Sequence, residues 1–169
     1  AWLDGLRTHT AVRGVRQVLH VADMARGACL QPAFVDGVRQ LGDAGLLFDL
    51  CLRPAELADG ARLAADCPQT TFVLDHCGNG DPGVIAGVGE APDGPFAHSA
   101  DDWRRHIDAL ASHANVVCKI SGIIARAPAT EDLADLLAPT VDHCLDAFGP
   151  ERVVFGGDWP VCTLGAPLA

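Results

Sequence analysis

The sequence predicts an α/β fold built on a parallel sheet. Short apolar runs rich in β-branched or large residues alternate with stretches in which apolar residues recur at helical spacing. Both faces of the runs look apolar, which is typical of a parallel sheet covered on both sides. The five expected strands are Arg13–Leu19, Leu46–Leu52, Thr71–His76, Val116–Ile120 and Arg152–Gly156.

Four helical stretches are expected between or after these strands. Pro32 opens the first and Gly45 ends it, since proline suits a first helical turn and glycine a helix end. The second covers Ala55–Asp66, and Ser99 caps the third. In the fourth, Pro139 is expected to kink or split the helix. Apolar residues at helical spacing are Phe34, Val38 and Leu41, then Trp103, Ile107, Leu110 and Ala111, then Leu133, Leu136, Leu137, Val141, Cys144, Leu145 and Phe148.

The strand–helix alternation predicts right-handed βαβ units, and no linker divides the chain, so residues 1–169 are expected to form one domain. A complete (β/α)8 barrel takes about 250 residues, and five strands do not close one. Ala1–Asp4 looks like the tail of a further strand, and the chain stops soon after its last strand. We therefore predict part of a (β/α)8 barrel rather than an open, doubly wound sheet.

Composition narrows the function classes. The net charge of −10 is dispersed, which disfavours binding to nucleic acid or to a membrane surface. No apolar run reaches the ~18 residues of a membrane span, and no export leader is visible. The seven cysteines form no C-x-x-C pair, so we expect buried, reduced thiols in a cytoplasmic protein rather than a cysteine-rich zinc site.

Two strand ends carry residues able to do chemistry. Asp158 follows Val-Val-Phe-Gly-Gly, and His76 ends Thr-Phe-Val-Leu-Asp-His, where it should share its side with Phe72 and Leu74. A carboxylate at the mouth of a buried strand is costly unless it is used or paired. A helix cap or turn remains open for Asp158, and a core histidine bonded to backbone for His76. If neither alternative applies, Asp158 and His76 together suggest a hydrolase, in which His76 is a metal ligand or a hydrogen-bond donor.

Three cationic side chains are further candidates. Lys119 lies inside an apolar strand, so its ammonium either reaches an edge or lines a wet, cup-shaped site. Arg16 suits a bidentate hold on a substrate carboxylate, or an ion pair with a buried aspartate such as Asp49. Arg126 is either an anion clamp or solvent-facing.

The segment Cys77–Ala100 is a long Gly/Pro-rich loop at a strand end, where loops are often functional. Its start spells G-x-G-x-x-G over residues 78–83. A dinucleotide site needs that loop to open a helix at once, and we expect no helix there. No G-x-S-x-G motif anchors a serine triad.

Five short motifs lie at the strand positions. In order they are Gly14-Val15-Arg16, Phe48-Asp49-Leu50, Val73-Leu74-Asp75-His76, Cys118-Lys119-Ile120-Ser121-Gly122 and Phe155-Gly156-Gly157-Asp158-Trp159-Pro160. Together they resemble the amidohydrolase-2 family, in the branch of the amidohydrolase superfamily that holds L-fuconolactonase and 2-pyrone-4,6-dicarboxylate lactonase.

The resemblance implies a distorted (β/α)8 barrel of which this chain supplies strands four to eight, while strands one and two and most of strand three are absent. Asp158 would activate water and His76 would match the sixth-strand histidine. Arg16 and Lys119 would line the cup, and Arg126 and Trp159 complete the predicted substrate-binding set. The reaction would be hydrolysis of a sugar or dicarboxylate lactone, in carbohydrate metabolism, without a metal.

One departure from the family pattern matters. The family's first strand carries His-x-His, and none occurs in this sequence. We therefore expect an N-terminally truncated fragment, inactive and poorly soluble alone. Two alternatives stay open: a metal-dependent amidohydrolase or decarboxylase in which His76 and Asp158 bind one zinc or manganese ion, and an inactive scaffold.

Overall fold

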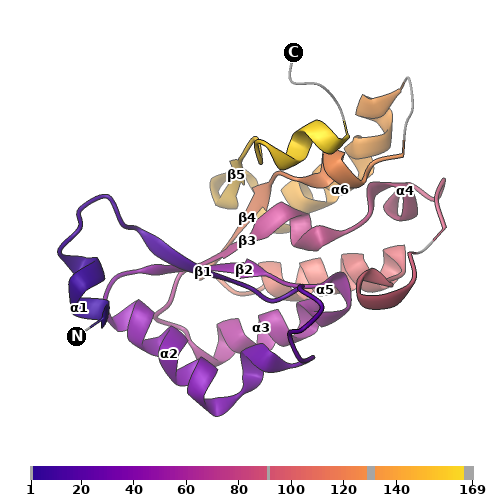
Figure 1. Ribbon diagram of the computed structural model, residues 1–169. Coiled ribbons are helices and arrows are strands. Elements are labelled where there is room, and N and C mark those ends of the chain that lie inside the picture. Colours follow the sequence, from indigo (N-terminus) through magenta and orange to yellow (C-terminus); the bar gives the residue numbers. More distant parts are fainter. Residues whose placement is uncertain (1, 91, 129–131, 166–169) are drawn as a thin grey trace.

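A computed structural model describes residues 2–90, 92–128 and 132–165. Five parallel strands form one sheet in the order of the sequence, so β1 and β5 are its edges (Figure 1). This order is the one that successive strands have in a barrel wall, and all five predicted strands are confirmed. The strands are β1 (Gly14–Val18), β2 (Leu47–Cys51), β3 (Phe72–Leu74), β4 (Val116–Ile120) and β5 (Val153–Phe155).

The four predicted helical stretches are also confirmed, and the described residues form two further α-helices. Ser99 accepts a hydrogen bond from the Asp102 backbone N–H at 3.0 Å, as the predicted cap requires. No helix of the described ranges is long and apolar enough to cross a membrane. The helices are α1 (Trp2–Arg7), α2 (Pro32–Asp43), α3 (Leu57–Asp66), α4 (Pro82–Ile85), α5 (Ala100–Ala111) and α6 (Leu133–Phe148).

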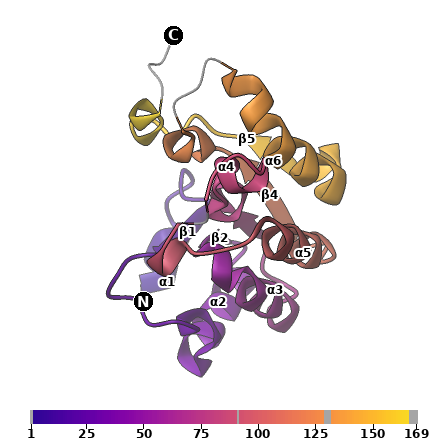
Figure 2. The same cartoon turned by 90° about the vertical axis from the view of Figure 1, so that its right-hand side faces the viewer.

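The two faces of the sheet differ in chemistry, so the expectation that both are apolar is wrong. Helices α2, α3 and α5 lie along one face (Figures 1 and 2), where Leu50, Phe72 and Leu74 are buried. On the other face Arg16 of β1 lies opposite Asp49 of β2 in the register. Alternation along each strand separates these two sets.

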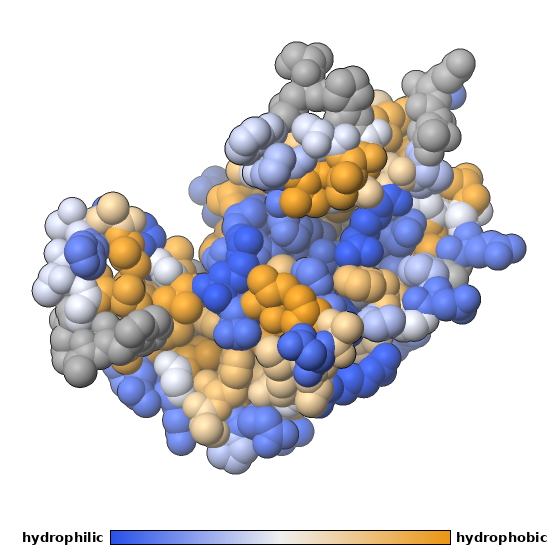
Figure 3. Space-filling model, viewed as in Figure 1, coloured by the Kyte–Doolittle hydropathy of each residue, from blue (hydrophilic) through white to orange (hydrophobic). Residues whose placement is uncertain are grey.

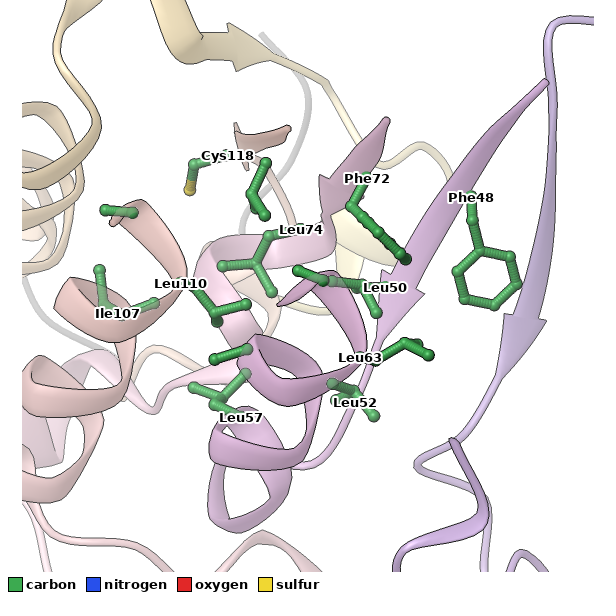
Figure 4. Packing of buried hydrophobic residues seen from close by; sticks show 14 of the residues in the cluster. Phe48, Leu50, Leu52, Leu57, Leu63, Phe72, Leu74, Ile107, Leu110 and Cys118 are labelled. Carbon is green, nitrogen blue, oxygen red and sulfur yellow. The ribbon is translucent and has the colours of Figure 1, made fainter. Parts of the chain in front are cut away.

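The hydrophobic core lies between the sheet and the helices (Figure 4). Side chains from β2, β3 and β4 meet those from α3 and α5 there, and aromatic edge contacts join Phe48 to Phe72 with ring centroids 6.2 Å apart. Large side chains with almost no exposure include Leu50, Leu52, Leu57, Leu63, Phe72, Leu74, Trp103, Ile107, Leu110 and Val116. This packing fixes the strand ends that carry the candidate site.

Pro139 does not split the fourth helical stretch, because α6 runs unbroken from Leu133 to Phe148. A proline in a helix removes one backbone hydrogen bond and crowds the preceding turn. Here the apolar contacts of α6 outweigh that cost, since Leu136, Cys144 and Phe148 are all buried along one side. Tertiary packing thus overrides the local preference.

The N-terminal segment is helical where a strand tail was expected. Trp2–Arg7 forms α1, and Leu3 and Leu6 pack against the core from positions three residues apart. That spacing places both leucines on one side of a helix, which explains why this segment does not extend as a strand.

The expectation that no helix follows the G-x-G-x-x-G sequence is also wrong, because α4 starts at Pro82. The two backbone amides Gly83 N–H and Val84 N–H are, however, occupied by the Asp81 carboxylate, at 2.8 and 3.3 Å. A phosphate would need those amides. Gly80 serves packing, since a Cβ there would lie 2.5 Å from Trp103 Nε1. The geometry therefore gives no dinucleotide site here.

Candidate functional site

Strand β3 ends at Leu74, and the chain then turns into a left-handed backbone. His76, Cys77 and Asn79 have φ of 55°, 50° and 58°. Such values are uncommon for residues other than glycine and occur at functional sites that the surroundings hold in place. Because the strand stops early, the predicted alternation fails: His76 does not share the core face with Leu74 but reaches a cavity on the other side.

Buried contacts hold this turn. Trp103 Nε1 donates to the carbonyl oxygen of Cys77 at 2.9 Å, and Asn79 Nδ2 donates to that of Leu52 at 2.9 Å. Gly78 has φ of 69°, and a Cβ there would come within 2.8 Å of Leu57 Cδ1, so both the backbone conformation and the packing favour glycine. These constraints fix the position of the His76 backbone before any ligand binds.

Asp158 follows β5 after two glycines and also has a left-handed backbone, with φ of 52°. Its Oδ1 lies 3.8 Å from His76 Nε2, which is too long for a direct hydrogen bond. Gly122 lies against both groups, since a Cβ there would come within 2.5 Å of His76 Nδ1 and 3.0 Å of Asp158 Oδ2. The two predicted residues therefore meet at one place without bonding to each other.

Ser121 fixes the ring of His76. Its Oγ lies 2.8 Å from His76 Nδ1, so the hydroxyl either donates to this nitrogen or accepts from it. In both cases Nε2 is directed away from Ser121 and stays available for chemistry. A partner on the second ring nitrogen is the usual way in which proteins orient a working histidine.

A cavity of about 470 Å³ lies at the carboxyl ends of the strands. Hydrophilic side chains gather across the middle of one molecular face (Figure 3). Three polar lining residues, His20, Cys51 and Asn79, were not among the predicted site residues, although His20 and Cys51 lie at the ends of predicted strands. The cavity is lined by Arg16, Val18, His20, Cys51, His76, Asn79, Gly122, Ala125, Arg126, Asp158, Val161 and Leu164.

Beside the cavity, two cations and two carboxylates form a closed charge network. Arg16 Nη2 donates to Asp49 Oδ2 at 2.8 Å, which is the ion pair left open by the sequence. Lys119 Nζ donates to Asp75 Oδ1 at 2.8 Å, and it lies 3.5 Å from Asp49 Oδ2. Asp75 is 0% exposed. The network is formally neutral, and its two cations offset the cost of burying the Asp75 carboxylate.

The second oxygen of Asp75 is less well satisfied. Its Oδ2 lies 2.9 Å from Arg16 Nε, yet no hydrogen bond is directed at it, because that N–H points to Asp49. The contact is therefore electrostatic. Burial alone would lower the pKa of Arg16, but the hydrogen bond that Arg16 donates to Asp49 and the charge of Asp75 raise it instead.

Arg126 differs from the other two cations because it has no carboxylate partner among the described residues. Its guanidinium lies over the ring of Phe96, 3.9 Å from the centroid, and Phe96 also contacts the ring of His20. Burial lowers the pKa of Arg126, and the nearby charge of Asp81 opposes that effect. Arginine nevertheless keeps its charge in proteins. Arg126 therefore places on the cavity wall a cation that makes no ion pair with a carboxylate of the described residues.

Two predicted site residues do not line the cavity. Trp159 is 74% exposed beside it, and Lys119 is engaged with Asp75 and Asp49 on the cavity-side face of the sheet. The structure thus brings together His76, Asp158, Arg16 and Arg126.

His76 and Asp158 are able to ligate one metal ion. Two ligands at ~2.0–2.2 Å from a tetrahedral zinc lie about 3.4 Å apart, near the observed 3.8 Å. A second group, Cys51, Asp75 and His76, has ligand atoms within 4.8 Å of one another. It suits a metal less well, because Lys119 and Arg16 already hold Asp75, and burial raises the pKa of Cys51 to about 11.

The lowered pKa values of two half-buried histidines, His20 and His106, predict how the stability of the fold depends on pH. Burial lowers the pKa of His20, as does the charge of Arg126, and burial likewise lowers the pKa of His106. The unfolded chain therefore binds protons more readily, so the free energy of unfolding should fall as the pH drops below about 6.5. Urea unfolding at pH 7.5 and 5.5 measures this.

In that experiment His20→Asn and His106→Asn should each flatten the pH dependence. The exposed His9→Asn is the matched control and should leave it unchanged. A wild-type chain equally stable at both pH values, or variants with the wild-type slope, would contradict the assignment.

A parallel sheet in barrel order carries a histidine, an aspartate and an arginine around a cavity at the carboxyl ends of its strands. This arrangement is that of an α/β-barrel protein, in which the active site lies at that end of the barrel. The chain belongs to the amidohydrolase family, which it matches over residues 3–169.

Named relatives and solved structures support this family assignment. The chain is 33% identical over 161 residues to an L-fucono-1,5-lactonase of Burkholderia multivorans, covering 93% of this chain and 52% of that protein. A crystal structure of a B. multivorans amidohydrolase with bound zinc is 31% identical, has a TM-score of 0.77, and is matched over 94% of this chain and 54% of its own.

A probable 2-pyrone-4,6-dicarboxylic acid hydrolase of Acinetobacter baumannii has a TM-score of 0.72 at 18% identity, over 99% of this chain and 57% of that chain, and supports the fold alone. The chain thus spans about half the length of the relatives it matches. The predicted fold, part of an amidohydrolase barrel, is confirmed.

Proposed function

We propose that the protein containing this chain hydrolyses a lactone, with Asp158 activating the attacking water. The observation that carries the proposal is that Asp158 and His76, from the ends of β5 and β3, lie 3.8 Å apart on one cavity. Relatives named as lactonases support the reaction class. A cytoplasmic location, a place in carbohydrate metabolism and a single domain over residues 1–169 stay predictions.

The chemistry follows from the positions of these groups. Asp158 accepts a proton from water, and the resulting hydroxide attacks the lactone carbonyl carbon. The ring C–O bond then breaks, and Asp158 returns its proton to the leaving alkoxide. General acid–base action of this kind contributes about 10²–10⁴-fold to the rate.

His76 polarises the carbonyl in this scheme. When the Ser121 hydroxyl donates to Nδ1, the N–H of His76 lies on Nε2 and donates to the carbonyl oxygen. The negative charge that develops on that oxygen makes the hydrogen bond stronger in the transition state than in the ground state. Ser121 therefore acts as a positioning residue that orients the ring, and its hydroxyl can donate to Nδ1 in this tautomer.

A metal-dependent amidohydrolase or decarboxylase is the second candidate, and the zinc in the B. multivorans structure favours it. His76 and Asp158 would hold the ion. Bound zinc acidifies a coordinated water and polarises carbonyl groups. In that case Nδ1–H of His76 donates to the Ser121 oxygen, which leaves the Nε2 lone pair free.

Arg126 is proposed to bind a carboxylate of the substrate, because its charge is not matched by a carboxylate of the described residues. A charge-assisted hydrogen bond is worth about 1.5–3 kcal/mol, so Arg126→Gln should raise KM for carboxylate-bearing lactones roughly 10- to 150-fold and leave kcat nearly unchanged. Neutral sugar lactones should be little affected. Steady-state kinetics on both substrate types test this.

The matched control for that prediction is Arg62→Gln, which removes an exposed arginine of α3. It should leave KM unchanged for every substrate. An equal loss on neutral and carboxylate-bearing lactones would contradict a carboxylate subsite at Arg126.

The reaction class is tested with a panel of sugar and dicarboxylate lactones and the full-length protein, before and after removal of metal. Turnover that survives chelation supports the metal-independent scheme, and loss with recovery on adding zinc or manganese supports the second candidate. The 169 residues alone are expected to be inactive. If the full-length protein hydrolysed none of these substrates with or without metal, the remaining interpretation would be an inactive scaffold.

A further inference from the structure

Three cysteines meet in the core, away from the cavity lining. Cys77 follows β3, Cys118 lies in β4 and Cys144 lies in α6, so three separate elements contribute. All three are 0% exposed, and their sulfur atoms lie within 4.8 Å of one another. Buried cysteines commonly act as small apolar side chains, but a mutual approach of three sulfur atoms is a specific arrangement.

The position of this thiol cluster (Cys77, Cys118 and Cys144) is set by the fold. Cys118 alternates with Lys119, so it faces the helical layer, and its sulfur points that way in Figure 4. Cys77 directly follows His76, and its Sγ lies 3.8 Å from the Lys119 carbonyl oxygen. The cluster therefore lies immediately behind the strand ends that carry the candidate site.

The geometry restricts what the cluster could bind. Sulfur atoms on one ion at ~2.3 Å lie about 4 Å apart, so the sulfur atoms need little movement. No fourth cysteine, histidine or carboxylate of the described residues joins the group. Structural zinc requires four ligands. A soft species that is satisfied by three sulfur ligands fits better.

We propose that Cys77, Cys118 and Cys144 form a binding site for a soft, thiophilic species that three sulfur ligands coordinate. Cu(I) and trivalent arsenic are two species of this kind. For arsenic the exchange is balanced without an oxidant. As(OH)3 and three thiols give As(S-Cys)3 and three waters: three As–O bonds and three S–H bonds break, and three As–S and three O–H bonds form.

Charge favours the same species. The arsenic tris-thiolate is neutral, and Cu(I) that displaces a single thiol proton also leaves the site neutral. A buried site without a counter-charge tolerates neutral products far better than charged ones. Because the sulfur atoms are fully buried, entry requires local opening between α6 and the sheet, so binding should be slow.

The test uses the reduced full-length protein with sodium arsenite and, separately, Cu(I), followed by X-ray absorption and mass spectrometry. We expect one equivalent of either species per chain with three sulfur neighbours at ~2.3 Å. Zinc should bind more weakly than both. The proposal would be overturned if the bound arsenic had oxygen neighbours, if neither arsenic nor Cu(I) bound to the protein, or if zinc bound as tightly as Cu(I).

Variants assign the ligands. Cys118→Ala and Cys144→Ala should each abolish the three-sulfur signal, whereas Cys67→Ala, at a buried cysteine outside the cluster, should keep it. A three-sulfur signal that survives in either cluster variant would refute the assignment. The wild-type coordination number decides the matter even if a variant does not fold.

Discussion

Asp158→Asn should lower kcat of the full-length protein about 10²- to 10⁴-fold on its lactone substrate, with KM little changed. An amide cannot accept the proton of the attacking water, while its size and its contacts with Gly122 stay nearly the same. The effect should fall on kcat because Asp158 acts on the water rather than on the substrate's substituents. Steady-state kinetics on the wild type and the variant measure it.

The control for this substitution is Asp146→Asn on the exposed side of α6, which should leave kcat unchanged. Metal content is measured in parallel. A loss of bound zinc together with activity would assign Asp158 to ligation rather than to proton transfer. A kcat within about tenfold of wild type would contradict both roles.

Asp75→Asn should destabilise the fold by about 3–5 kcal/mol, which is the cost typical of removing one partner of a buried ion pair. Asp75 is 0% exposed and faces both Lys119 and Arg16. Without its charge, the two cations share only Asp49, so the network carries an uncompensated positive charge. Urea unfolding followed by tryptophan fluorescence and circular dichroism gives the free energy of unfolding.

The comparison for Asp75 is Asp36→Asn, which removes an exposed pair with Arg39 in α2. Exposed pairs contribute little, so the change should stay within about 0.5 kcal/mol. Equal effects of the two substitutions would show that the charge network does not stabilise the fold.

Much of the architecture could be predicted from local signals. The β-branched runs marked the strands, and Pro32 and Ser99 marked helix starts, because each of these residues acts through its own backbone geometry. The meeting of His76 and Asp158 could also be anticipated. Carboxyl ends of parallel strands lie at one edge of a sheet, so residues that follow β3 and β5, on either side of β4, lie at the same edge.

Other parts of the site depended on geometry that local signals do not carry. Strict alternation placed His76 with Leu74, but the left-handed turn after β3 reversed its direction. Ser121 and Gly122 acquire their roles only because the ring of His76 packs on them. The pairing of Lys119 with Asp75 likewise requires the strand register. The continuity of α6 across Pro139, where a split was one of the expected outcomes, also depends on packing rather than on the local effect of the proline.

A crystal structure of the full-length protein with a lactam, the non-hydrolysed analogue of its lactone substrate, tests the account most directly. We expect the ring carbonyl carbon beside Asp158 and its oxygen within hydrogen-bond distance of His76 Nε2. A lactam seated in another cavity, such as the apolar one lined by Phe34 and Leu41, with Asp158 and His76 turned away from it, would contradict the account.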